Sequence, residues 1–120
     1  MKKIIKLSAL IGLSVLGTNA MASTMECYVD TPAYDEFRSR TCFAMIYGQR
    51  YTTAVFRIVE DKAIASVLWG GAAAGKCTDN GNYCSFTIRS MSAYSVSATV
   101  LYEDGTYGTA SAVASFEDGR

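Results

Sequence analysis

YSVSATVLYEDGTYGTASAVASF, residues 94–116, is the stretch of this sequence that decides the fold. Every second residue from Tyr94 to Tyr102 is apolar, and Ser or Thr fills most positions between them. From Gly108 to Phe116, small or aromatic residues again alternate with Ser, Thr or Val. A period of two predicts two strands, each with one face in a core and one in water. The EDG sequence between them predicts the turn of an antiparallel hairpin.

The turn has to keep the two apolar faces of this hairpin together. A two-residue turn would set Val100 opposite Thr109 and mix polar with apolar side chains. A three-residue turn at residues 103–105, with its glycine as a left-handed bulge, sets Val96 opposite Ala112. We therefore predict the second register.

The rest of the chain repeats this kind of pattern. No stretch of ten or more residues after Glu26 has helical periodicity, whereas β-branched and aromatic runs separated by Gly, Asn and Asp recur about every ten residues. The expected strands are residues 25–29, 41–47, 53–59, 64–69, 83–89, 94–102 and 106–116. About seven short strands predict an all-β antiparallel sandwich.

The small residues of the last strand leave room for large side chains from the facing sheet. The available fillers are Trp69, Phe56, Phe86 and Phe43. A sugar-stacking platform is the alternative role for Trp69. We assign Trp69 to the core, because it ends an apolar strand and has no second aromatic residue at a fixed spacing nearby.

The YSVSATV run from Tyr94 and the Asp-Gly pair at residues 104–105, preceded by Trp69, resemble the last hairpin of bacterial immunoglobulin-like and PKD-like β-sandwich domains. The likeness covers residues 64–116. Trp69 is followed by GGAAAG rather than by the acidic loop of PKD domains, and no Cys in the Tyr94 strand could bridge to Cys42. The resemblance implies an immunoglobulin-like sandwich with a role in adhesion or binding.

The N-terminal sequence MKKIIKLSALIGLSVLGTNAMA, residues 1–22, has the pattern of a cleaved signal peptide. Three lysines precede a short apolar run, and Ala20 and Ala22 supply the small residues of a cleavage site. That run is shorter than the roughly 20 residues that cross a bilayer, so we expect no membrane insertion after cleavage. Nor does Cys27 lie at the cleavage point, as a lipid anchor requires. We expect one secreted or periplasmic domain, residues 23–120.

Cleavage after Ala22 changes the charge balance. It leaves 98 of the 120 residues and removes three of the 11 basic groups but none of the 11 acidic ones, so the net charge becomes −3. Binding to a nucleic-acid backbone depends on clustered Lys and Arg. We therefore expect no nucleic-acid partner.

The four cysteines are Cys27, Cys42, Cys77 and Cys84. An even number in a small exported domain predicts disulfides, for which three pairings are open. We favour Cys27 with Cys42 and Cys77 with Cys84, because each pair closes a turn-rich segment; a loop of about 15 residues contributes about 3 kcal/mol. The spacings are too wide for a structural zinc site and the DNGN turn at residues 79–82 lacks the ligands of a calcium loop, so we expect no metal or cofactor.

The segment at residues 70–84 is the most distinctive surface element. Its first half, residues 70–75, is expected to be flexible, and its second half is clamped if Cys77 pairs with Cys84. A clamped loop is preorganised for binding; the alternative is a stapled connection between strands. The candidate partner-binding residues are Lys76, Asp79, Asn80, Asn82 and Tyr83, with exposed tyrosines expected among Tyr28, Tyr34, Tyr47, Tyr51 and Tyr107.

The sequence contains no histidine, so serine-triad and Cys-His mechanisms are excluded. Adjacent acids occur at residues 35–36, 60–61, 103–104 and 117–118, in predicted turns or ends, and a carboxylate-based hydrolase ranks last among the functions considered. We expect no enzyme but a binding module for a protein or surface polymer. The alternative is an inhibitor or immunity-type protein that blocks a partner enzyme. An unblocked sheet edge would also allow two copies of the chain to pair.

Overall fold

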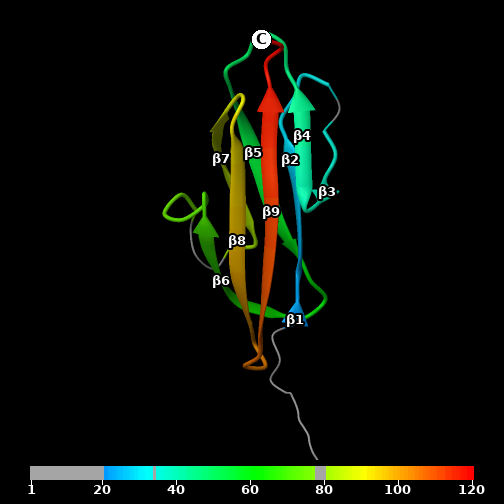
Figure 1. Cartoon of the computed structure of the whole chain (residues 1–120). Coiled ribbons are helices and arrows are strands. Elements are labelled where there is room, and N and C mark those ends of the chain that lie inside the picture. Colours follow the sequence, from blue (N-terminus) through cyan, green and yellow to red (C-terminus); the bar gives the residue numbers. More distant parts are fainter. Residues whose placement is uncertain (1–20, 34, 78–80) are drawn as a thin grey trace, which may run out of the picture.

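Two β-sheets packed face to face make up the protein in the computed structural model, which describes residues 21–33, 35–77 and 81–120 (Figure 1). The front sheet in Figure 1 is built on the hairpin of β8 (Ala93–Tyr102) and β9 (Tyr107–Glu117), with β6 (Ile64–Gly71) paired to β8. The back sheet has the order β3 (Arg38–Ser39), β2 (Thr24–Val29), β5 (Tyr51–Val59) and β7 (Tyr83–Arg89). The predicted all-β sandwich is therefore confirmed.

Two short strands share the outer edge of β9. β1 (Met21–Ala22) pairs with the start of β9 and β4 (Thr41–Met45) with its end, and both run parallel to it. The sequence predicted only antiparallel pairs, and neither β1 nor β3 was predicted. Two-residue strands show no periodicity, because their pairing depends on the neighbouring strand rather than on their own sequence.

The central hairpin has the predicted register. Val96 lies opposite Ala112 and Thr99 opposite Thr109. Gly105 closes the three-residue turn with φ of 90°, a left-handed conformation that glycine adopts without steric cost. The alternation of Ser and Thr with apolar residues therefore set the register correctly.

The core lies between the inner faces of the two sheets. Val96, Val100 and Phe116 from the hairpin are buried, and Trp69 and Phe56 from β6 and β5 are buried with them, as predicted. The half-buried Phe86 stacks on Phe56 with ring centroids 5.6 Å apart. Phe56 and Phe86 come from the facing sheet, as predicted, whereas Trp69 belongs to β6, in the same sheet as the alanines of β9.

Phe43 is the exception among the predicted core residues, because its side chain is 56% exposed. Its neighbour Cys42 is buried and points into the sandwich, where it bonds to Cys27. Successive residues of a strand point to opposite faces, so Phe43 must point outward. The prediction that Phe43 fills the core was wrong.

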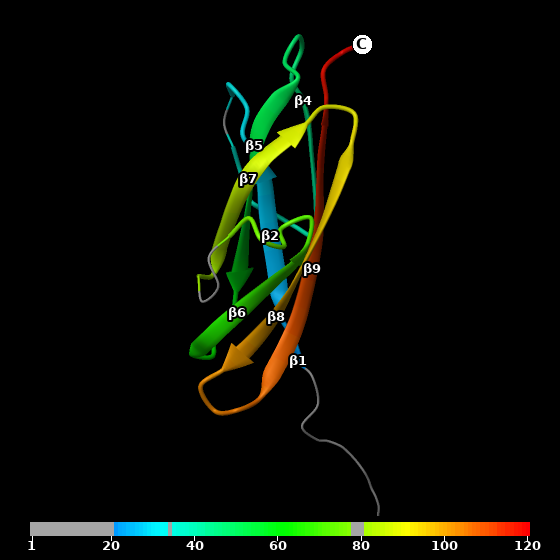
Figure 2. The ribbon, with the colours of Figure 1, turned by 90° about the vertical axis from the view of Figure 1, so that its left-hand side faces the viewer.

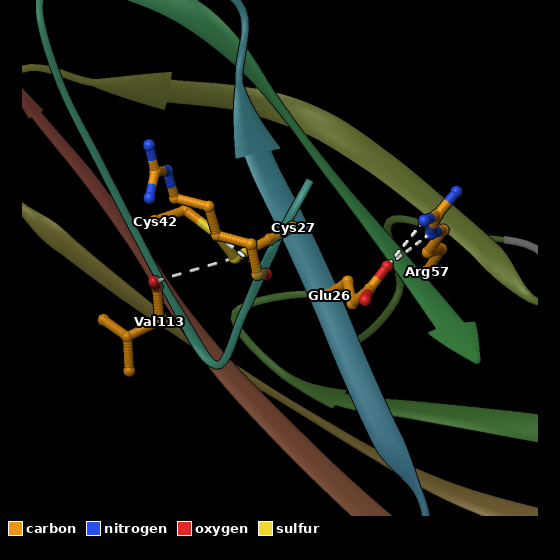
Figure 3. Close-up of a disulfide and its surroundings, with 6 residues drawn as sticks. Glu26, Cys27, Cys42, Arg57 and Val113 are labelled. Carbon is orange, nitrogen blue, oxygen red and sulfur yellow. Dashed lines mark hydrogen bonds and ion pairs between the residues drawn. A yellow bond between two sulfur atoms is a disulfide. The ribbon is translucent and has the colours of Figure 1, made fainter. Parts of the chain in front are cut away.

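Both predicted disulfides are confirmed. Cys27 on β2 is bonded to Cys42 on β4, so this bridge joins the two sheets through the core. Figure 3 shows the bridge on the inner side of β2, while the preceding residue, Glu26, points outward to Arg57. The second bridge joins Cys77 to Cys84 on β7 and ties the β6–β7 connection to the back sheet.

The connection between β7 and β8 is fixed by Tyr94, whose hydroxyl accepts a hydrogen bond from the backbone N–H of Arg89 at 2.9 Å. Tyr94 lies near the start of β8 and its ring also contacts Phe86 edge-on. This bond holds the passage of the chain from the back sheet to the front sheet. Within the described ranges, no helix is long and apolar enough to cross a membrane.

Candidate functional site

The β6–β7 connection is packed over much of its described length. β6 continues to Gly71, two residues past its predicted end. The backbone N–H of Ala72 then donates to the Ser95 carbonyl at 2.9 Å, and Ala73 is completely buried. Ala72 and Ala73, within the segment expected to be flexible, are therefore held against the sandwich, since small apolar residues can pack closely against a sheet where long side chains cannot.

The far part of the same connection is held at two points. The Trp69 indole N–H donates to the Gly81 carbonyl at 3.0 Å, and the disulfide fixes Cys77 to Cys84. Figure 2 shows this connection running across the side of the sandwich from β6 to β7. The segment therefore closes the open side between the two sheets and presents its end at β7.

The predicted partner-binding residues fall into two groups. Lys76, Asn82 and Tyr83 are exposed, whereas Asp79 and Asn80 lie outside the described residues. Lys76 places its ammonium group 5.9 Å from the centre of the Phe86 ring, and the Asn82 carbonyl accepts the Ile58 N–H at 2.9 Å. Of these three residues, Tyr83 alone belongs to a strand and presents a large apolar surface, since its side chain is 55% exposed.

The structure places Tyr83 in a row across the outer face of the back sheet. Its cross-strand neighbour on β5 is Arg57, and the next residue in the row is Glu26 on β2. Arg57 donates from Nε and Nη2 to Glu26 Oε1 at 2.9 and 2.6 Å. Hydrogen bonds to Glu26, and also to Tyr83, raise the pKa of the Arg57 guanidinium above its ordinary value.

Two further aromatic side chains complete this cluster. The Arg57 guanidinium carbon lies 3.7 Å from the centre of the Phe37 ring, a cation–π geometry. Phe37 meets Tyr28 edge-to-face with centroids 4.8 Å apart. We call these five side chains the Tyr83 cluster: Glu26, Tyr28, Phe37, Arg57 and Tyr83. Sequence reasoning named Tyr28 and Tyr83 but missed the other three, although the charged positions of β2 and β5 could have been read as outward-facing.

The remaining tyrosines lie elsewhere. Tyr51 shares the back-sheet face but is six residues from Arg57 along β5, about 20 Å in an extended strand. Tyr107 is on the front sheet, and Tyr47 is in the turn after β4. All three are exposed, whereas Tyr34 lies outside the described residues. The structure therefore brings two of the predicted tyrosines into one cluster.

One pair of carboxylates that interact in a turn, Asp30 and Asp35, is not among the adjacent acids. Asp30 and Asp35 share a hydrogen bond, which raises the pKa of Asp30. Thr31 donates to Asp35 Oδ1 from both its backbone N–H and its hydroxyl, each at 2.9 Å, and these bonds lower the pKa of Asp35. Asp30 is exposed, and the Thr31 bonds are those of a turn that an Asp side chain closes.

Comparison with known proteins identifies no relative. No protein-family model matches the chain. No curated protein and no solved structure matches it either. The chemistry of the chain's own residues therefore carries the functional argument.

Proposed function

We propose that the protein is an exported, non-catalytic binding module that holds a protein or a surface polymer against the Tyr83 cluster. The observation that carries this proposal is the position of Tyr83. It is half exposed on a strand, directly before the disulfide-bonded Cys84 and directly beside Arg57. Tyrosine and arginine are, with tryptophan, enriched at the energetic centres of protein interfaces.

Rigidity adds to the case for this surface. Arg57 is held by Glu26 on one side and by the Phe37 ring on another, so its planar head is oriented before any partner arrives. The disulfide fixes the backbone that carries Tyr83. Side chains that are already ordered lose less entropy on binding, which leaves more of the contact energy as affinity.

We also propose export, with the segment of residues 1–22 as the signal peptide. Disulfides form and persist in oxidising compartments, and the two bridges of this domain fit the periplasm or the extracellular medium. N-terminal sequencing of protein recovered outside the cytoplasm tests this proposal. Ser23 is the expected first residue, and an intact Met1 on exported protein would contradict it.

The strand arrangement supports an immunoglobulin-like topology that, among the described residues, lacks one strand of the usual back sheet. β2, β5 and β7 correspond in order to strands A, B and E, while β6, β8 and β9 correspond to C, F and G. The hydroxyl of Tyr94 bonds to the backbone five residues upstream, as a tyrosine corner does at the start of strand F. Domains of this architecture serve many binding roles, so the fold alone does not specify a ligand.

The alternative function is that of an inhibitor or immunity-type protein, which blocks a partner enzyme. Its contact surface would be the same, but its partner would be one enzyme, bound tightly and at fixed stoichiometry. Loss of that enzyme's activity on addition of one equivalent of the domain favours this alternative. Weak binding to an envelope protein or polymer favours the adhesive module.

The experiment that tests the proposal is capture of envelope and culture-supernatant components by the oxidised protein and two variants. Tyr83→Ser removes the centre of the cluster, whereas Tyr107→Ser removes an exposed tyrosine from the other sheet. We expect the Tyr107 variant to retain the partner and the Tyr83 variant to lose it. Equal capture by both variants, or no specific capture by the unaltered protein, would overturn the proposal.

A further inference from the structure

A groove of about 520 Å³ lies on the side of the molecule opposite the Tyr83 cluster, over the outer face of β8 and β9. It reaches from these strands to the edge of the front sheet between β1 and β4, where Ser23 and Arg40 form its rim. We call it the Arg40 groove.

The floor of the Arg40 groove is a regular array of hydroxyl groups. Ser97 lies opposite Ser111 and Thr99 opposite Thr109, and all four residues are exposed. Strand geometry spaces them about 5 Å apart across the strands and about 7 Å apart along them. A Cβ atom on Gly70 would lie 2.9 Å from Ser97 Oγ, so this glycine keeps space for the hydroxyl.

The sheet edge beside this floor has a gap. Thr109 accepts a hydrogen bond from the Ser23 N–H, and Val113 donates one to the Arg40 carbonyl. Backbone groups of every second residue point to the same side of a strand, so Ser111 directs its N–H and C=O to this edge as well. Ser111 has no strand beside it, because β1 ends its pairing at Thr109 and β4 begins its own at Val113.

Arg40 occupies this gap in an unusual conformation. Its φ is 69°, in the left-handed region that few residues other than glycine adopt. Its backbone N–H donates to the Met25 carbonyl at 3.2 Å, and its own carbonyl accepts the Val113 N–H at 2.7 Å. These two bonds link the two sheets. Its guanidinium has no hydrogen bond or ion pair with any residue in the described parts of the chain. Such strained positions cluster at binding sites.

Charge defines what the groove can accept. Arg40 has the one charged side chain among the residues that line it, and no carboxylate lies among them. An arginine head offers a planar fork of donors that fits a carboxylate or sulfate group with two parallel hydrogen bonds. The adjacent hydroxyls both donate and accept hydrogen bonds, as sugar hydroxyls do.

We propose that the Arg40 groove binds an acidic saccharide. Arg40 contacts the carboxylate or sulfate group, and the hydroxyls of β8 and β9 contact the sugar ring. The lining holds no aromatic ring on which a nucleotide base could stack.

A titration of the oxidised protein followed by amide NMR shifts tests this proposal. The probes are a sulfated oligosaccharide, an unsulfated polyuronate oligosaccharide and an uncharged glucose oligomer, with sodium sulfate as the ion alone. We expect saturable shifts at Ser97, Thr99, Thr109 and Ser111 with at least one acidic saccharide and none with the uncharged one. The first two probes distinguish sulfate from carboxylate recognition.

Two arginine variants distinguish binding in the Arg40 groove from a general attraction of anions to a positive charge. Arg40→Gln is expected to weaken binding about tenfold or more, as for loss of a charged hydrogen bond. Arg50→Gln removes another exposed arginine, whose guanidinium has no partner among the described residues, and is expected to change the affinity less than about twofold. Equal weakening by both variants would overturn the proposal, as would shifts confined to the Tyr83 cluster or no saturable binding of any acidic probe.

Arg40→Gly distinguishes a binding role from a structural one. Glycine adopts the left-handed conformation without strain and keeps the two backbone hydrogen bonds. We expect the thermal midpoint to stay the same or rise while saccharide binding is lost. Retained binding by this variant would contradict a role for the guanidinium.

Discussion

Tyr102 donates a hydrogen bond from its buried phenolic hydroxyl to Glu60 Oε2 at 2.6 Å. The bond connects the end of β8 in the front sheet to the residue that follows β5 in the back sheet. The same hydroxyl bonds to Ser23 Oγ, and Lys62 lies over the ring with its ammonium 4.5 Å from the centre. One tyrosine therefore ties together both sheets and the start of β2 at this end of the sandwich.

This bond makes stability depend on pH in two directions. The Tyr102 hydrogen bond lowers the pKa of Glu60 from its ordinary 4.5, so the pair stabilises the fold fully above that pH and loses its effect as pH falls through the lowered value. Burial, and then Glu60, raise the pKa of Tyr102 above 10.0. The contribution of Tyr102 to stability is therefore present below pH 10.0 and is lost as pH rises through the raised pKa.

Tyr102→Phe is therefore expected to lower the free energy of unfolding at pH 7 by about 1–3 kcal/mol. It should also remove the decline of stability above about pH 10 and reduce the decline at low pH. Trp69 is the one tryptophan of the chain and is buried, so its fluorescence can follow urea unfolding across the pH range. If the variant lost stability above pH 10 as the unaltered protein does, Tyr102 would not be the group responsible.

The two disulfides are expected to contribute unequally to stability. Cys27 and Cys42 are separated by 15 residues and Cys77 and Cys84 by 7. On the chain-entropy account, replacing each pair by alanine costs about 3 kcal/mol and about 2 kcal/mol respectively. Urea unfolding of the two double variants measures the difference. A larger cost for the 77–84 pair would show that loop length does not govern these bridges.

Two glycines of the β6–β7 segment offer a matched pair of substitutions. Both Gly71 and Gly75 have positive φ, so alanine strains the backbone at either position. A Cβ at Gly71 would also lie 2.5 Å from the Ser95 carbonyl oxygen, whereas nothing lies within 4 Å of one at Gly75. We expect Gly75→Ala to cost about 1 kcal/mol and Gly71→Ala about 1–3 kcal/mol more. Equal thermal midpoints for the two variants would contradict the close contact.

β4 is expected to support self-association. The N–H of Ile46, the residue after β4, donates to the Glu117 carbonyl of β9, so the backbone groups of Phe43 and Met45 face away from β9. The side chains of Phe43 and Met45 are also exposed. Exposed apolar edge strands pair readily, and a lysine on the edge prevents this. Sedimentation at rising concentration should detect a dimer that Phe43→Lys abolishes. Leu68→Lys, on the opposite edge strand, is the control; if it alone abolished the dimer, the interface would lie at β6.

The sequence predicted best where side-chain alternation and turn chemistry agree. For the hairpin they specify one register, and the structure has that register. The local cysteine pairing was also correct, because each pair brackets a turn that brings its ends together. These features depend on residues close together in the chain.

What could not be predicted depends on contacts between distant segments. Phe43 is of a residue type common in cores, but its side chain points outward because the Cys27–Cys42 bridge holds the neighbouring Cys42 inward. Arg57, Glu26 and Phe37 come from three segments whose pairing fixes their proximity. The left-handed φ of Arg40 has no local sequence signal at all.

β1 pairs with Gly108 and Thr109 through the two residues that precede the proposed cleavage point. The amide nitrogen of Ser23 donates to the Thr109 carbonyl at 3.1 Å. Under the proposed cleavage, that nitrogen becomes a charged terminal ammonium with its acceptor already in place, while Gly108 loses its neighbouring strand. Cleavage would therefore uncover the edge of β9 at Gly108 and Thr109 and place one new positive charge beside the Arg40 groove.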